Sequence, residues 1–306
     1  MTTITKTMSP EAIQNLYAKV KPLALRETQP QYTLWQLKTS EVTITAYQSG
    51  KVVFQGKDVS WLVDEESKKD ASKSVKPSSN NTSSSSKSPS TFFPQAGSDE
   101  VGTGDYLGPL VVASAIVPDA QTAAKLEALH ITDSKAMTDT IIRQVAPKIA
   151  QILPYCVIVL SNERYNALYN PEFMNLNKLK AQAHNQAYLK LQKKGYQIPE
   201  LAVVDQFCAP RLYFSYLKDS KEVFRALHFE TKAESKYPAV AAASVLARFA
   251  FLQAMDQLEK QYGMALAKGG GSQATKSAQE FVDKYGKDQL KYVAKLHFIN
   301  TTRLKG

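Results

Sequence analysis

One long stretch almost without apolar side chains argues against a single continuous domain. Residues 69–91 read KDASKSVKPSSNNTSSSSKSPST. Such a composition buries too little apolar surface to offset the entropy lost when the chain becomes ordered. We therefore predict a flexible tether over residues 67–92, which joins a small unit of residues 1–66 to a large unit of residues 93–306.

The charge of the chain favours a polyanionic partner. Lysine and arginine number 38 against 28 aspartates and glutamates, which gives a formal net charge of +10 over 306 residues. A basic surplus of this size promotes nucleic-acid binding, because neutralising phosphates releases their counterions. A basic protein with some other role is the alternative.

Cysteine usage and the N-terminal residues bear on the cellular compartment. Neither Cys156 nor Cys208 has a CxxC partner, so zinc ligation and a disulfide framework are not expected. The N-terminal sequence MTTITKTMSP lacks the apolar region of a signal peptide. No stretch approaches the roughly 20 apolar residues of a membrane span. We expect a cytoplasmic protein that does not enter a membrane.

The small unit has the pattern of an α+β module. Ser9 and Pro10 are typical of a helix start and predict a short helix over residues 10–20. Three segments alternate with period two, and Ser49-Gly50 predicts a hairpin turn between the last two. These predicted strands are residues 32–37, 41–47 and 51–55, and a second helix is expected to start within residues 58–63. One helix on a three-stranded antiparallel sheet is therefore expected.

The large unit alternates apolar strands with helical stretches. Strands are predicted over residues 108–117, 154–160 and 201–205, and helices over residues 138–153, 175–194, 237–262 and 273–285. In the second helix the apolar residues recur at helical spacing along one face. This alternation predicts an α/β domain with a mixed sheet and helices packed on it.

The first candidate for chemistry is the segment Gly97-Ser-Asp-Glu-Val-Gly-Thr-Gly-Asp105. Asp99 and Glu100 precede two glycines, whose freedom lets a backbone come close to a ligand. A carboxylate pair beside such a turn suits a hard cation and a phosphodiester. A hairpin loop with two solvated acids is the structural alternative. Both acids share one face only if the strand ends or twists there, since neighbours on a strand alternate.

Two further acids follow apolar segments. Asp205 ends the run LAVVD, an arrangement that presents a carboxylate at the rim of a sheet or simply caps a loop. Glu234 precedes a helix rich in small residues, where an acid also suits the helix N-terminus electrostatically. Mg²⁺ prefers oxygen ligands, and two such ions promote in-line displacement at a phosphodiester. Acids that crowd together repel one another and have raised pKa values until cations bind.

Several motifs in sequence order resemble type 2 ribonucleases H, and in detail the ribonuclease HIII branch. They are GSDEVGTGDYLGPLVV, the tripeptide Asp133-Ser134-Lys135, NLNKLKAQAHNQA, VVDQF, ETKAESKYPAVAAASVLAR and the closing AKLHFINT. The resemblance runs from about residue 97 to the end of the chain. In the small unit, VTITAYQSGKVVFQGK is similar to the TBP-like substrate-binding module of that branch.

The resemblance implies a ribonuclease H-like α/β catalytic domain and a TBP-like α+β module that helps to grip the substrate. It implies metal-dependent endonucleolytic cleavage of the RNA strand of RNA–DNA hybrids, which leaves 3′-hydroxyl and 5′-phosphate ends. The implied cofactors are two Mg²⁺ or Mn²⁺ ions, and the implied state is a monomer. The implied catalytic residues, which are also the metal ligands, are Asp99, Glu100, Asp205 and Glu234.

Two differences separate this chain from the ribonuclease HII branch. That branch carries aspartate at the position of Glu234 and Gly-Arg-Gly in place of Gly102-Thr103-Gly104. The turn is expected to contact the RNA backbone, where the 2′-hydroxyl marks ribose. The residues implied to contact substrate are Gly102, Thr103, Gly104, Lys135, Asn175, Asn177, Lys180 and Lys232.

Other readings stay open at this stage. They are incision at single ribonucleotides in DNA, as in ribonuclease HII, a hybrid-binding protein without catalysis, and an integrase-like nuclease acting on DNA duplexes. The histidines form no metal-ligand spacing, and we expect His184 to pack or hydrogen-bond. Gly269-Gly270-Gly271 is expected to be a mobile loop near the substrate groove.

Overall fold

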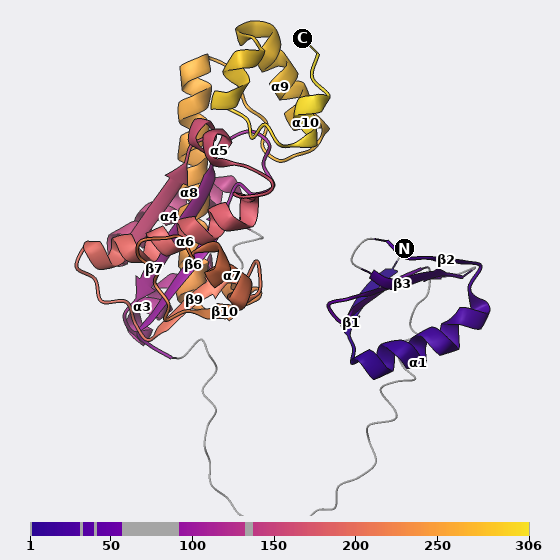
Figure 1. Ribbon diagram of the computed structural model, residues 1–306. Coiled ribbons are helices and arrows are strands. Elements are labelled where there is room, and N and C mark those ends of the chain that lie inside the picture. Colours follow the sequence, from indigo (N-terminus) through magenta and orange to yellow (C-terminus); the bar gives the residue numbers. More distant parts are fainter. Residues whose placement is uncertain (1, 31–32, 40–41, 57–91, 132–136, 306) are drawn as a thin grey trace, which may run out of the picture. The chain divides into compact units, whose positions relative to one another are not determined.

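The computed structural model describes residues 2–30, 33–39, 42–56, 92–131 and 137–305. The chain divides into two units, residues 1–83 and 84–306, and each has its own hydrophobic core (Figure 1). Residues 67–91 of the predicted tether and the helix start predicted within residues 58–63 lie outside the described residues. The predicted unit boundaries therefore stay predictions.

In the small unit one helix packs on one face of a sheet. Helix α1 (Pro10–Val20) begins where predicted, and the Ser9 hydroxyl accepts a hydrogen bond from the amide of Ala12 at 3.2 Å. Its apolar face meets the central strands in a single core. That core comprises Ile13, Leu16, Val20, Trp35, Leu37, Val42, Ile44, Ala46, Val52 and Phe54.

The sheet of the small unit has five strands, so the prediction of three was wrong. The strands are β1 (Thr2–Thr7), β2 (Arg26–Thr28), β3 (Thr33–Lys38), β4 (Val42–Tyr47) and β5 (Lys51–Gly56), in the antiparallel order β1-β5-β4-β3-β2. The two strands missed, β1 and β2, form the edges and read TTITKT and RET. Edge strands with so few apolar residues give no hydrophobic period to detect.

The large unit is built on a mixed sheet of order β10-β9-β6-β7-β8. The strands are β6 (Gln95–Val101), β7 (Leu110–Val117), β8 (Tyr155–Leu160), β9 (Leu201–Asp205) and β10 (His228–Glu230). Strand β6 pairs antiparallel with β7 and parallel with β9. The predicted strands β7, β8 and β9 are confirmed, whereas β6 and the three-residue strand β10 were not among the predicted strands.

Helices cover both faces of this sheet (Figure 1). Helix α6 (Leu176–Lys193) packs on β7 and β8, whereas α8 (Pro238–Tyr262) packs on β6 and β7 from the opposite face and contacts α4 (Asp139–Ile152). All four predicted helices are confirmed to within one residue at each end. The fourth of these is α9 (Ser272–Tyr285). The other described helices of the large unit are α3 (Ala120–Glu127), α5 (Asn162–Leu168), α7 (Pro210–Tyr216) and α10 (Ile299–Thr302), with 3₁₀ turns η5 (Ala233–Ser235) and η6 (Lys287–Tyr292). The small unit has the 3₁₀ turn η1 (Lys21–Leu23).

Helix α8 forms the centre of the large unit. Its small residues Ala239 to Ala243 are fully buried, which allows the helix to approach the sheet closely. Among the described helices, α8 alone is long and apolar enough to cross a membrane, although the sequence was expected to contain no membrane-spanning stretch. However, 67% of its apolar 18-residue segment is buried inside the protein. Burial of this extent is that of a core helix.

Candidate active site

The two adjacent acids of β6 point to opposite faces of the sheet. Asp99 is 9% exposed, and its carboxylate accepts a hydrogen bond from the hydroxyl of Ser244 on α8. Glu100 points toward α6, where Lys180 and His184 contact its two carboxylate oxygens. Because β6 remains regularly paired through both acids, the alternation of side chains along a strand separates them.

Asp205 stands beside Asp99 across a parallel strand pair. The last paired residues of β6 and β9 are Ser98 and Val204. Asp99 and Asp205 follow them directly and therefore lie side by side at the same level of the sheet. The Oδ1 atom of Asp205 accepts a hydrogen bond from the amide of Ala233 at 3.0 Å, which fastens η5 to the end of β9. Glu234, the next residue of η5, is 6% exposed. The fold thus gathers these three acids at one end of the sheet.

Burial and neighbouring charge make Asp99 hard to ionise. Burial first, and then the negative charges of Glu100 and Asp205, raise the pKa of Asp99 to about 8. Hydrogen bonds from the Ser244 hydroxyl and from the Glu100 amide, the latter at 2.7 Å, oppose this increase without cancelling it. Crowded carboxylates of this kind are stabilised by a divalent cation, which relieves their repulsion.

Glu100 is held by two side chains of α6. The Nζ atom of Lys180 and the Nε2 atom of His184 each lie 2.9 Å from one of its oxygens. Burial alone would raise the pKa of Glu100, but the hydrogen bond from His184 and the charge of Lys180 hold it below its usual range. His184 also bonds to Ser98 at 2.8 Å, and the Lys180 ammonium lies 3.9 Å from the centre of the Phe207 ring. The hydrogen-bonding role expected for His184 is confirmed.

The donor chemistry of the site fits Mg²⁺ or Mn²⁺. All four predicted ligands offer carboxylate oxygens, which hard divalent cations prefer. Within the described residues no three acidic, histidine or cysteine side chains are already arranged around one metal position. The contacts of Glu100 with Lys180 and His184 direct its carboxylate toward α6, away from Asp99. Asp99, buried next to the charge of Asp205, is the part of the site that most needs added positive charge.

Metal binding to this site is expected to release a proton near neutral pH. Because the pKa of Asp99 is about 8 without metal, its carboxyl is mostly protonated at pH 7 and must ionise to bind a cation. Mn²⁺ affinity should therefore rise as the pH increases toward about 8 and level off above it. Calorimetry at pH 7 in buffers of different ionisation enthalpy measures the proton release. A heat of binding that does not depend on the buffer would contradict the prediction.

The turn between β6 and β7 contains a glycine that the fold requires and another that it does not. Gly102 has a φ of +95°, and a Cβ atom there would lie 2.1 Å from the carbonyl oxygen of Pro109. Gly104 is exposed, and no atom lies within 4 Å of the position of its Cβ. A missing side chain at an exposed turn lets a ligand backbone approach. Contact of Gly102, Thr103 and Gly104 with RNA stays a prediction. The exposed and uncrowded position of Gly104 supports it best.

Three predicted substrate contacts lie at the start of α6. Asn175 caps the helix, since its side chain accepts a hydrogen bond from the amide of Lys178 at 3.0 Å. Asn177 is half-buried in the first turn. Lys180 is only 7% exposed and is bound to Glu100, so in this structure its ammonium is not presented to a substrate.

Of the two other predicted lysine contacts, Lys232 lies among the described residues. Lys232 is exposed and takes a left-handed backbone conformation, with a φ of 55°, directly before η5. Such a conformation is uncommon for a residue with a side chain, and it directs the chain from β10 into the turn that carries Glu234. Lys135 lies outside the described residues.

Sequence reasoning passed over two residues that support the site. Ser244 bonds to Asp99, and its signal was that it is the lone polar residue in the run from Ala239 to Leu246. Lys295 is completely buried, and its ammonium donates to the carbonyl oxygens of Asp105 and Gly108 at 2.7 and 2.5 Å. Burial lowers the pKa of Lys295 to about 7. Through these two bonds, Lys295 holds the turn that contains Gly102 and Gly104, called the glycine turn below, against the C-terminal segment.

The segment Gly269–Gly271 is fastened to the glycine turn, so the prediction of a mobile loop does not match the structure. The amide of Gly269 donates to Oδ1 of Asp105 at 2.7 Å, and its carbonyl accepts from the amide of Tyr106 at 2.9 Å. The side chain of Asn300 donates to the carbonyl of Gly270 at 3.0 Å. These bonds give the turn a second fixed wall beside the one that Lys295 provides.

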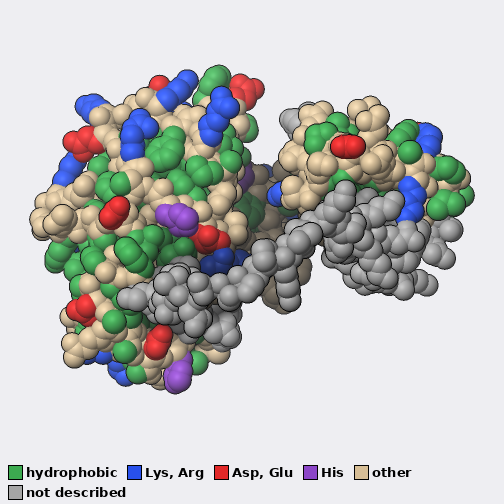
Figure 2. Space-filling view, turned by 90° about the horizontal axis from the view of Figure 1, so that it is seen from below, with side chains coloured by type: hydrophobic (Ala, Val, Ile, Leu, Met, Phe, Trp, Pro, Cys, Tyr) green, Lys and Arg blue, Asp and Glu red, His purple; other side chains and the backbone are tan. Residues whose placement is uncertain are grey.

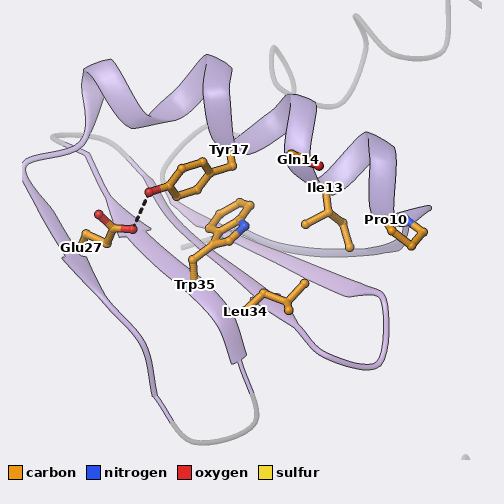
Figure 3. A pocket seen from close by; sticks show the side chains of 7 residues that line it. All are labelled: Pro10, Ile13, Gln14, Tyr17, Glu27, Leu34 and Trp35. Atoms are coloured by element: carbon orange, nitrogen blue, oxygen red, sulfur yellow. Dashed lines mark hydrogen bonds between the residues drawn. The ribbon is translucent and has the colours of Figure 1, made fainter.

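A separate hollow of about 360 Å³ lies in the small unit, between α1 and the strands β2 and β3 (Figure 3). The rings of Tyr17 and Trp35 lie 5.4 Å apart within it, and the Tyr17 hydroxyl donates to Glu27 at 2.8 Å. Two of its polar groups, those of Tyr17 and Glu27, thus bond to each other. All four candidate catalytic acids belong to the large unit, whereas this hollow belongs to the small unit.

Comparison with known proteins agrees with this arrangement. The family model for ribonuclease HII matches residues 96–301, and that of a domain of unknown function, DUF3378, matches residues 3–86. A ribonuclease HIII of Geobacillus sp. strain WCH70 is 42% identical over 276 residues, which cover 90% of this chain and 88% of the relative. The ribonuclease HIII of Bacillus subtilis is 39% identical over 296 residues, 92% of this chain and 90% of the relative.

Solved structures show the same fold. The crystal structure of Bst-RNase HIII in complex with Mn²⁺ aligns with a TM-score of 0.68 and 36% identity, over 99% of this chain and 97% of that one. Ribonuclease H2 from Pyrococcus horikoshii shares the fold with a TM-score of 0.56 and 23% identity, over 69% of this chain and 96% of that one.

Fold, acids and matches together define a type 2 ribonuclease H, a hydrolase that cleaves RNA endonucleolytically with Mg²⁺ or Mn²⁺. Relatives that match most of the chain narrow the assignment further. The chain belongs to the ribonuclease HIII family. The predicted family, fold class, ribonuclease H activity and use of Mg²⁺ or Mn²⁺ are confirmed, whereas the number of metal ions and the chemistry of the product ends stay predictions.

Proposed function

We propose that Asp99, Glu100, Asp205 and Glu234 hold the divalent cations with which this ribonuclease cuts the RNA strand of RNA–DNA hybrids. The observation that carries the proposal is the buried carboxylate of Asp99, crowded by Glu100 and Asp205 at the end of the sheet. Two bound cations would supply the positive charge that activates a water and stabilises the leaving oxygen. The products are then 3′-hydroxyl and 5′-phosphate ends.

The chain's own residues keep these carboxylates in place. Ser244 and the Glu100 amide orient Asp99. Lys180 and His184 hold Glu100 on the other face of the strand, so its carboxylate has to leave these partners to bind the same cations. Phosphodiester hydrolysis of this kind depends on positioned charge more than on a protein nucleophile. Fixed acids therefore suffice, and no side chain needs to form a covalent bond to the substrate.

Recognition of the hybrid is proposed to rest on charge and on the glycine turn. The net charge of +10 favours association with a nucleic-acid backbone. Figure 2 shows Lys and Arg side chains along one margin of the large unit, with hydrophobic and some acidic side chains between them. Gly104 leaves room for the RNA backbone, at which a 2′-hydroxyl is read. The small unit is proposed to add to this grip, as the TBP-like module does in the family.

Cleavage of a series of end-labelled duplexes tests this function. The series contains an RNA–DNA hybrid, a DNA duplex with one ribonucleotide, and plain DNA, each with Mg²⁺, with Mn²⁺ and with chelator. We expect metal-dependent cuts throughout the RNA of the hybrid and little cutting at the single ribonucleotide. Efficient incision at that ribonucleotide would indicate the ribonuclease HII specificity instead, and cutting of plain DNA would indicate an integrase-like nuclease. Binding without cutting would leave a hybrid-binding protein.

We also infer that the protein works as a monomer in the cytoplasm, away from membranes. The one described helix of membrane-spanning length is mostly buried in the core. Light scattering after gel filtration tests the oligomeric state, for which a mass near 33.9 kDa is expected.

A further inference from the structure

A cavity lies beside the acids, between α4 and α8. It has a volume of about 330 Å³, enough for a phosphate with its sugar. Its lining includes Glu100 and Ser244 from the acid cluster and Asp139 and Arg248 from the two helices. Since Ser244 hydrogen-bonds to Asp99, this space adjoins the position where a substrate phosphate would be cut.

Arg248 and Lys268 bind to the same carboxylate in this region. The Nε and Nη2 atoms of Arg248 each lie 2.9 Å from Oδ1 of Asp139, and Nζ of Lys268 lies 2.7 Å from Oδ2. Burial acts to raise the pKa of Asp139, but the hydrogen bonds from Lys268 and Arg248 lower it, so the acid stays ionised. Two cations and one anion leave this three-residue cluster with a net charge of +1.

The guanidinium of Arg248 keeps donors available in a fixed orientation. Its two contacts with Asp139 use two of the five N–H groups that an arginine offers. Its planar group also lies 5.2 Å from the centre of the Phe251 ring, which further restricts its rotation. An arginine fixed in this way loses little entropy when it binds a phosphate through its remaining donors.

We propose that Arg248, oriented by Asp139 and assisted by Lys268, binds a backbone phosphate of the RNA strand next to the phosphate that is cut. The proposal rests on the proposed function, because it takes the acid cluster as the place of cleavage. Lys268 directly precedes Gly269, which is bonded to the glycine turn, so the same loop would connect this phosphate contact to the turn.

A second arginine–aspartate pair between the same helices serves as a control. Arg143 of α4 and Asp256 of α8 form a bidentate pair with distances of 2.6 and 2.7 Å. Neither residue lines the cavity, and their side chains are 40% and 49% exposed. If Arg248 only linked α4 to α8, its removal should resemble removal of Arg143.

The test compares Arg248→Gln, Arg143→Gln and Asp139→Asn in the full-length protein. Hybrid affinity is measured by fluorescence anisotropy with chelator over a range of salt concentrations, and cleavage kinetics are measured with Mg²⁺. We expect Arg248→Gln to weaken affinity and raise KM by about tenfold, to lower the salt slope by about one, and to leave kcat within about twofold. Arg143→Gln should leave affinity and KM unchanged.

Removal of the negative charge of Asp139 gives a sharper result than removal of the positive charge of Arg248. Asp139→Asn removes the negative charge beside Arg248 and Lys268 but keeps a side-chain oxygen that accepts the hydrogen bonds orienting Arg248. It should therefore tighten hybrid binding, whereas a purely structural ion pair predicts that both partners act alike. Equal effects of Arg248→Gln and Arg143→Gln, or weaker binding by Asp139→Asn, would overturn the proposal. A wild-type protein that fails to cut the hybrid would instead refute the proposed function, so the two failures are distinct.

Discussion

An Asp99→Asn variant is expected to lose at least about a thousandfold in the rate of hybrid cleavage while it still folds and binds the hybrid. Such a loss corresponds to roughly 4 kcal/mol of transition-state stabilisation, within the range that a bound metal ion supplies. Asparagine has nearly the same shape as aspartate but cannot supply a negative oxygen. Since the pKa of Asp99 is about 8 without metal, folding at neutral pH does not depend on its charge.

Cleavage rate, melting temperature and hybrid affinity of this variant should be measured together. Asp119→Asn is a suitable control, because Asp119 only caps α3 through the amide of Thr122 and asparagine caps a helix equally well. The variant at Asp99 should also lose the buffer-dependent proton release on Mn²⁺ binding. Wild-type cleavage by Asp99→Asn would exclude Asp99 from the metal site.

Local patterns were sufficient to predict much of this fold. The hydrophobic period located α6 and α8 almost to the residue, and the run LAVVD located β9 together with the acid at its end. These signals are local, since they depend on spacing within one element. Residue types near turns pointed to the acids, and resemblance to a family added which of them belong together.

Contacts between distant segments could not be read in this way. Lys180 and Glu100 are 80 residues apart, and nothing near either one shows that α6 packs on the face of β6 to which Glu100 points. Lys180 was therefore predicted to lie on the surface as a phosphate contact. The direction of Glu100 itself follows from the alternation along β6, yet which helix covers which face depends on the tertiary fold.

The close approach of α8 to β6 leads to the second large effect, which concerns Gly97. This residue lies two positions before Asp99 and faces the same helix. A Cβ atom added at Gly97 would lie 2.3 Å from the amide nitrogen of Val240 and 2.5 Å from the carbonyl carbon of Ala239. These are backbone atoms in the first turn of α8, so no side chain can rotate away to make room.

Gly97→Ala is therefore expected to destabilise the large unit by about 3 kcal/mol or more, as overpacking does at rigid sites. The melting temperature should fall by roughly 6–12 °C. Cleavage should fall as well, because a shift of α8 moves Ser244 away from Asp99.

Gly104→Ala provides the contrasting case, since no atom lies within 4 Å of its added Cβ. Its melting temperature should stay within about 2 °C of the wild type, while hybrid binding weakens, because the new methyl group stands where RNA is proposed to approach. Thermal denaturation and hybrid affinity of both variants separate the two roles. If Gly97→Ala melted like the wild type, α8 would have to yield at little cost, and the tight packing that positions Ser244 against Asp99 could not be what holds the site together.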